Sequence, residues 1–152
     1  MKHIARISVF GGRKISKENY DKAYNLGKLL DINNYLVYCG GGEGVMEAVA
    51  KGVHESGGQC VGILKGISTD EMNSYIDIPI ATNMGITRNA LLAYSCDAAV
   101  AISGKYGTLS EIAYALQLEK TVIGLGTWDI DGVINASDEK EIINKLNDIY
   151  RK

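Results

Sequence analysis

Residues 103–111 have the composition and spacing of a phosphate-binding turn. Their sequence is Ser-Gly-Lys-Tyr-Gly-Thr-Leu-Ser-Glu, and they stand between an apolar run (98–102) and apolar residues at helical spacing. A strand, a glycine turn and a helix start in this order direct free backbone N–H groups and the positive end of the helix dipole toward a ligand. An ordinary strand-to-helix connection would also fit this segment when it is read alone. The candidate phosphate contacts are Gly104, Lys105, Tyr106, Gly107 and Thr108.

Two other predicted strands also end in glycines, which points to a shared cleft. The strand 4–10 ends in the first glycine turn (Gly11–Gly12), and the strand 35–39 runs into the second (Gly40–Gly44); Ser103–Thr108 is the third. Clustered glycines permit positive φ angles and a close approach of the main chain to a ligand or to a packed helix. The candidate ligand contacts in the first two turns are Gly11, Gly12, Gly41 and Gly42.

Two charged side chains could act on a ligand in that cleft. Glu111 stands three residues after Thr108, which is the spacing of a helix capping box, and capping alone would explain both residues. A carboxylate on the first helical turn could also hold a ribose hydroxyl or stabilise positive charge at a sugar carbon. Arg88 opens a predicted helix, where its charge opposes the helix dipole. It either pairs with a surface acid or grips a phosphate or carboxylate.

Predicted strands and helices alternate along the chain. The strands are apolar runs, which is typical of strands covered by helices on both faces. This alternation predicts an α/β fold, a three-layer, doubly wound, mainly parallel sheet, in a single domain over residues 1–152. Ligands of such sheets bind at the carboxyl ends of the strands, where the glycine turns lie. The expected strands are 4–10, 35–39, 59–64, 76–80, 98–102 and 121–125, and the expected helices are 17–32, 44–56, 86–95, 108–119 and 139–150. Ser16 can cap the first of these helices, and Asp138 and Glu141 have the spacing of a capping box for the last.

The composition is that of an ordinary globular protein. Apolar residues make up 46% and charged residues 22% of the 152 residues, and the net charge of −2 argues against nucleic-acid binding. No apolar run approaches the roughly 20 residues of a membrane span, and no signal peptide precedes the first strand. Three cysteines without a Cys-x-x-Cys pair fit reduced, buried thiols, and the two histidines have no ligand-spaced companions. We therefore expect a cytoplasmic protein with no metal site, no membrane partner and no nucleic-acid partner.

These motifs together resemble those of the Lonely Guy (LOG)/SLOG superfamily. The segment 40–48 is similar to the Gly-Gly-Gly-x-x-Gly-Leu-Met signature of the LOG cytokinin-activating phosphoribohydrolases, which are often labelled lysine decarboxylases. Residues 103–111 resemble that family's Pro-Gly-Gly-x-Gly-Thr-x-x-Glu, and Thr87-Arg88-Asn89 falls where those proteins carry an Arg-Lys pair. The Thr-Arg-Asn and Gly-Thr-Leu-Ser-Glu-Ile phrases are closer to a shorter branch, which includes molybdenum-cofactor carrier proteins and relatives of DprA.

The resemblance implies a Rossmann-like homo-oligomer, a homodimer or homotetramer, that binds a phosphorylated small molecule. It implies that Arg88 and Glu111 match the essential pair of the hydrolase branch, and that Gly104, Gly107 and Thr108 match its phosphate contacts.

The chain departs from the family pattern at three positions. Ser103 replaces a proline, Lys105 replaces a glycine and Asn89 replaces the lysine beside the arginine. Replacing glycine by lysine restricts the backbone at position 105, whereas the ammonium group of Lys105 could add a phosphate contact. These departures are compatible with ligand binding and bring hydrolysis into question.

Two functions therefore compete, and the sequence does not decide whether the protein is an enzyme. The favoured one is a carrier or sensor that needs no cofactor and holds a nucleotide or molybdopterin-type ligand unchanged. The alternative is hydrolysis of the N-glycosidic bond of a nucleoside 5′-monophosphate, with Arg88 fixing the substrate and Glu111 stabilising an oxocarbenium-like state or orienting water. Lysine decarboxylation is rejected, because Lys105 would lie on the phosphate turn rather than at a reacting centre.

Overall fold

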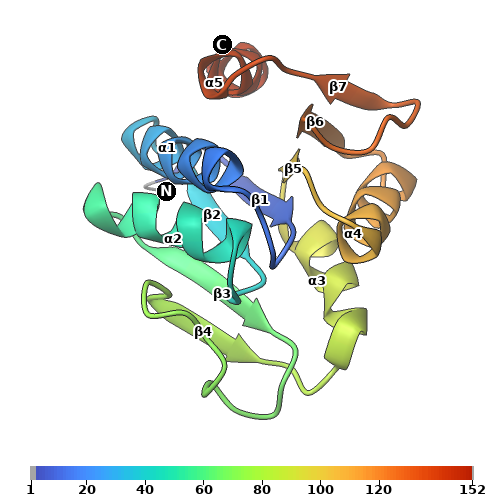
Figure 1. The fold of residues 1–152 in the computed structure, drawn as a ribbon. Coiled ribbons are helices and arrows are strands. Elements are labelled where there is room, and N and C mark those ends of the chain that lie inside the picture. The colour runs from blue at the N-terminus through green and yellow to red at the C-terminus, as the bar shows by residue number, and fades with distance from the viewer. Residues whose placement is uncertain (1–2, 152) are drawn as a thin grey trace.

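A parallel sheet with helices on both faces forms the protein, in a computed structural model that describes residues 3–151 (Figure 1). Met1, Lys2 and Lys152, the ends of the predicted domain, lie outside these residues. Within them the strand order is β4-β3-β2-β1-β5-β6-β7, and every neighbouring pair is parallel. The predicted doubly wound α/β fold is thereby confirmed. The strands are β1 (Arg6–Gly11), β2 (Leu36–Cys39), β3 (Cys60–Leu64), β4 (Ile78–Ala81), β5 (Ala98–Ile102), β6 (Thr121–Leu125) and β7 (Val133–Asn135).

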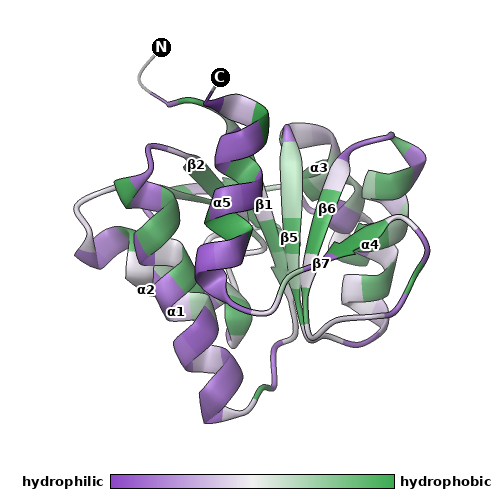
Figure 2. Ribbon diagram, turned by 90° about the horizontal axis from the view of Figure 1, so that it is seen from above, coloured by the Kyte–Doolittle hydropathy of each residue, from purple (hydrophilic) through white to green (hydrophobic). Residues whose placement is uncertain are grey.

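Two helical layers enclose the sheet. On one side lie α1 (Lys17–Ile32), α2 (Val45–Glu55) and α5 (Glu139–Tyr150); on the other lie α3 (Arg88–Ser95) and α4 (Tyr106–Gln117) (Figure 1). Each layer has its own apolar core, and β5 contributes alternate side chains to the two cores because strand side chains alternate in direction. In Figure 2 the strands are coloured mainly as hydrophobic, whereas α1 and α5 carry many hydrophilic residues on the sides that face away from the sheet.

The strand order places the glycine turns at the point where the chain changes direction across the sheet. The chain runs outward from β1 to β4 and then returns to β5, which pairs with the opposite edge of β1. Connections after β1 and β5 therefore leave toward opposite faces and open a crevice at the carboxyl ends. The two turns lie close together there, since a Cβ added at Gly12 would lie 3.6 Å from the Gly104 Cα.

Most predicted elements are present, with boundary shifts that have local causes. Ser16 caps α1 by accepting a hydrogen bond from the Asn19 amide, as predicted. Asp138 caps α5 through the Glu141 amide, but the Glu141 carboxylate returns to Ser137 rather than to the cap residue. The strand predicted over 76–80 begins at Ile78, and the helix predicted from residue 86 is divided into the 3-10 turn η1 (Gly85–Thr87) and α3. The three-residue β7 is too short for a periodic pattern and was not predicted.

The capping box predicted for Thr108 and Glu111 is wrong. Helix α4 begins at Tyr106, so Thr108 lies inside its first turn and Lys105 takes the cap position, without a side-chain cap bond. The positive φ of Gly104 (+95°) reverses the chain earlier than the hydrophobic periodicity indicates. Capping therefore does not explain why a carboxylate stands at position 111.

Glycines let α1 and α2 approach closely on one face of the sheet. A Cβ added at Gly27 in α1 would overlap the Val49 carbonyl oxygen, and one added at Gly52 in α2 would overlap the Tyr24 carbonyl oxygen. The two helices therefore meet backbone to backbone. No helix among residues 3–151 combines the length and apolarity that crossing a membrane requires.

Gly27→Ala and Gly52→Ala are each expected to lower the free energy of unfolding by about 2–4 kcal/mol, because the added methyl overlaps the facing backbone. Intrinsic helix propensity alone would have the opposite effect, because alanine in place of glycine raises the free energy of unfolding by about 1 kcal/mol. Urea unfolding measures the difference. Gly66→Ala is the control, since its nearest contact would be 3.8 Å from the new Cβ. Unchanged stability in both helix variants would contradict the close approach.

Candidate functional site

A cavity of about 450 Å³ opens at the carboxyl ends of the strands, between the first and third glycine turns. It brings together charged side chains that follow three different strands or begin a helix. Most of them are cations, and Glu111 is the one acid among the lining residues that the structure describes. The charged lining residues are Arg13, Lys14, Lys65, Arg88, Lys105 and Glu111.

The structure gathers most of the predicted site residues around this cavity. Three are placed elsewhere: Gly41, Gly42 and Tyr106 are not among the lining residues. Tyr106 is 80% exposed, and its ring centroid lies 6.3 Å from that of Trp128. The predicted residues that do line the cavity are Gly11, Gly12, Arg88, Gly104, Lys105, Gly107, Thr108 and Glu111. Their roles in binding or catalysis stay predictions.

The start of α4 presents backbone donors to the cavity. Within the described part of the chain, the amides of Gly104, Lys105, Tyr106, Gly107 and Thr108 donate no hydrogen bond to a protein acceptor. These include the first amides of the helix, which no residue of the helix can accept. Glycine is required at position 104, because φ is positive and a Cβ would overlap the Thr108 side chain. This geometry is suited to an anion.

The third glycine turn is anchored from outside by the segment after β6. The Thr127 hydroxyl donates to the Ser103 carbonyl at 2.7 Å, and the Trp128 indole N–H donates to the Lys105 carbonyl at 2.9 Å. Ser103 has a φ of +51°, which the ring of a proline excludes. Lys105 has a negative φ of −117°, so its position does not require the left-handed backbone that favours glycine. The anchoring role of Trp128 was not predicted, because no local sequence pattern links this residue to the turn.

Arg88 is buried and bonded to main chain rather than to an acid. Its side chain leaves the first residue of α3, and Nη1 donates to the carbonyls of Gly40 and Ile63, each at 2.7 Å. Its Nε is buried without a partner, and among residues 3–151 no carboxylate lies within 4 Å of the guanidinium. The surface ion pair that the sequence allowed is therefore wrong.

The second glycine turn supports the site instead of lining it. The Gly41 and Gly42 amides point to sulfur atoms, those of Cys39 and Met46, each at 3.4 Å. The carbonyls of the same glycines accept the backbone and side-chain N–H of Asn73, each at 2.8 Å. The amides of this turn are thus occupied within the protein, and its carbonyl groups hold neighbouring segments.

Glu111 faces the cleft from α4 and is 7% exposed. Burial raises the pKa of its carboxyl group to about 8, although the nearby Arg88 charge acts to lower it. Burial likewise lowers the pKa of Arg88, and the Glu111 charge partly offsets that effect. The carboxyl group is therefore mostly protonated at neutral pH and can donate a hydrogen bond or a proton.

The three cysteines are buried free thiols, as expected, and the Cys39 and Cys60 sulfurs lie 3.8 Å apart beneath the second glycine turn. Over the described range, no cluster of three or more His, Cys, Asp or Glu side chains could hold a metal ion.

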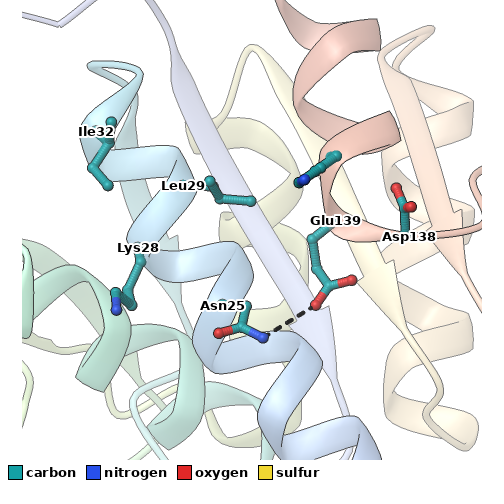
Figure 3. A pocket seen from close by; sticks show the side chains of 7 residues that line it. Asn25, Lys28, Leu29, Ile32, Asp138 and Glu139 are labelled. Atoms are coloured by element: carbon teal, nitrogen blue, oxygen red, sulfur yellow. Dashed lines mark hydrogen bonds between the residues drawn. The ribbon is translucent and has the colours of Figure 1, made fainter.

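A second hollow, of about 410 Å³, lies between α1 and α5, away from the carboxyl ends of the strands (Figure 3). Its lining mixes both charges, and Asn25 donates to Glu139 across it at 3.5 Å. Ile32 on its wall is 68% exposed. Because charges of opposite sign and exposed side chains form this hollow, it offers no concentrated field for an ionic ligand.

Comparisons with known proteins identify relatives of this chain. The chain is 42% identical over 122 residues to an uncharacterised protein of Archaeoglobus fulgidus, with 80% of each chain covered. It is 31% identical over 146 residues to the cytokinin riboside 5′-monophosphate phosphoribohydrolase LOG4 of Arabidopsis thaliana, covering 86% of this chain but only 65% of that relative.

Solved structures and a family model complete the comparison. The structure of the molybdenum cofactor binding protein from Rippkaea orientalis superposes with a TM-score of 0.90 at 30% identity, covering 95% of this chain and 96% of the other. This confirms the Rossmann-like fold and the LOG/SLOG resemblance carried by the glycine motifs. The model of the SLOG cluster4 family matches residues 4–150. The chain therefore belongs to the SLOG cluster4 family.

Proposed function

We propose that the cavity at the strand ends binds a phosphorylated nucleotide-like or pterin-type ligand, and that the protein acts as a carrier or sensor. The unpartnered amides from Gly104 to Thr108 carry this proposal. Several of these N–H groups are free at the start of one helix, so a single phosphate group can accept hydrogen bonds from several of them together. The cavity volume of about 450 Å³ is in the range of small-molecule sites.

The electrostatics of the lining support an anionic ligand. Five cationic side chains face the cavity among the described residues, and the one acid, Glu111, is mostly neutral at pH 7. Nothing in the lining balances this charge, so a phosphate gains charge-assisted hydrogen bonds without displacing an existing ion pair. The likeness to the molybdenum cofactor binding protein of Rippkaea orientalis favours a pterin-type ligand.

N-glycosidic hydrolysis is the second candidate, and the protonated Glu111 near Arg88 favours it. A neutral carboxylic acid cannot supply the negative charge that stabilises an oxocarbenium-like state. It can instead protonate the departing base while water adds to the sugar carbon, which releases the base and ribose 5-phosphate. The likeness to the Arabidopsis phosphoribohydrolase supports this reaction class.

Assembly and location stay predictions. We propose a homodimer or homotetramer in the cytoplasm. Exposed aromatic side chains on α3 and α4, namely Tyr94 and Tyr106, offer apolar surface for subunit contacts.

Binding is tested by calorimetry and thermal unfolding with AMP, a phosphorylated pterin and inorganic phosphate. The midpoint of unfolding should rise with ligand concentration. Lys105→Gln should weaken binding about tenfold, because it removes one charge from the phosphate site. Lys17→Gln, which removes the same charge from an exposed position outside the cavity, should leave binding unchanged. No shift with any of the three compounds would refute the proposal.

Hydrolysis is tested by release of adenine from AMP. If the protein is a hydrolase, Glu111→Gln should lower kcat at least about 100-fold, since glutamine keeps the shape but has no proton to give. Its AMP affinity should stay near that of the unchanged protein, which separates lost chemistry from lost binding. Equal release by both proteins, or release by neither, would eliminate this second candidate.

Stability should depend on pH through Glu111. Its folded pKa of about 8 lies above the usual value, so its contribution is fully present below about pH 4.5 and is lost as the pH rises through 8. Between these limits the free energy of unfolding should fall by several kcal/mol relative to Glu111→Gln. Urea unfolding from pH 5 to 9 measures this difference; parallel curves for the two proteins would show that the carboxyl group is ionised in the fold.

A further inference from the structure

We infer that the cleft contains a second anion-binding subsite between Arg13 and Arg88, so that the ligand carries a second anionic group apart from the phosphate at α4. This inference rests on the proposed binding function and deepens it. It identifies the ligand class as a phosphorylated molecule with two separated anionic groups, of which a nucleoside bisphosphate is an example.

Both guanidinium groups border the second glycine turn. Arg13 follows the first glycine turn, and its Nη2 lies 3.2 Å from the position of a Cβ added at Gly42. Arg88 Nη1 donates to the Gly40 carbonyl, two residues earlier in the same turn. The Met46 side chain packs against both glycines, and all three of these side chains line the cavity. The turn after β1, helix α2 and helix α3 therefore each contribute one side chain to this part of the cavity.

Neither guanidinium has a carboxylate within ion-pair distance in the part of the chain that the structure describes. Across residues 3–151, Arg13 forms no ion pair and its side chain makes no hydrogen bond to the protein, and the buried Nε of Arg88 has no partner. The charge of Arg13 contributes to lowering the pKa of Arg88, which shows that the two groups repel each other. Guanidinium groups bind oxyanions through planar, paired hydrogen bonds, so an anion between them would relieve the repulsion.

The second subsite is separated from the start of α4 by the width of a strand. The amide donors follow β5 and the second glycine turn follows β2, while β1 lies between these strands in the sheet. Adjacent strands are about 4.8 Å apart, so the two places are roughly 10 Å apart. Lys65, which follows β3, extends the positive surface on the same side. Such spacing fits two separate anionic groups better than the contiguous phosphates of a diphosphate.

Calorimetry with AMP, ADP and adenosine 3′,5′-bisphosphate at one ionic strength tests this subsite. The bisphosphate should bind about tenfold more tightly than AMP. Arg13→Gln should remove that advantage and weaken AMP binding much less than bisphosphate binding, because AMP has no second anion. Arg13 is exposed, so the variant should fold, which its unfolding midpoint verifies. Lys17→Gln, with the same loss of charge, should preserve the difference.

The possible results distinguish failure of the second subsite from failure of the proposed binding function. Equal affinities for AMP and the bisphosphate would overturn the second subsite and leave phosphate binding intact. Equal weakening of both ligands by Arg13→Gln would place Arg13 at the first phosphate and overturn it as well. ADP binding more tightly than the bisphosphate would overturn the separation of the anions. Failure of all three compounds to bind would contradict both the subsite and the proposed function.

Discussion

The uncompensated charge of Arg88 governs the arrangement of the cleft. Its guanidinium is removed from water, and two main-chain carbonyls replace the acid that usually accompanies a buried cation. Gly40 must lack a side chain, because a Cβ there would collide with Arg88 and with Met46. The nearest ionisable acid, Glu111, is itself buried and stays mostly neutral. The charged lining of the cavity is therefore mainly cationic, as the proposed binding of an anionic ligand requires.

Each of the three glycine turns has a different role in forming that cavity. The third turn presents backbone donors and is anchored by Thr127 and Trp128. In the second turn two amides donate hydrogen bonds to sulfur atoms, and carbonyl groups accept them from Arg88 and Asn73. This turn therefore supports the wall of the cavity, and those two amides are not free for a ligand. The first turn lies against the main chain of the third turn at Gly104. Three similar sequence patterns thus perform different tasks because their neighbours differ.

The departures from the LOG pattern are structurally consistent with one another. Ser103 takes a backbone angle closed to proline, while Lys105 has a negative φ that does not require glycine. The altered turn keeps its free amides and gains an ammonium group at the cavity. These changes add positive charge to the cavity and leave the carboxyl group of Glu111 in place. They are therefore compatible with the proposed anion binding.

Local sequence signals were enough to predict the parallel sheet, the strand ends and the caps of α1 and α5, because apolar runs and the Ser16 and Asp138 side chains act over a few residues. They also made Arg88 and Glu111 candidates for one cleft, and the family resemblance added that they form a pair. They did not show that α4 starts at Tyr106, that the Gly41 and Gly42 amides are occupied, or that Glu111 is protonated. Each of these depends on groups distant in the chain, since burial, backbone contacts and the field of a neighbouring charge exist only once the layers have packed.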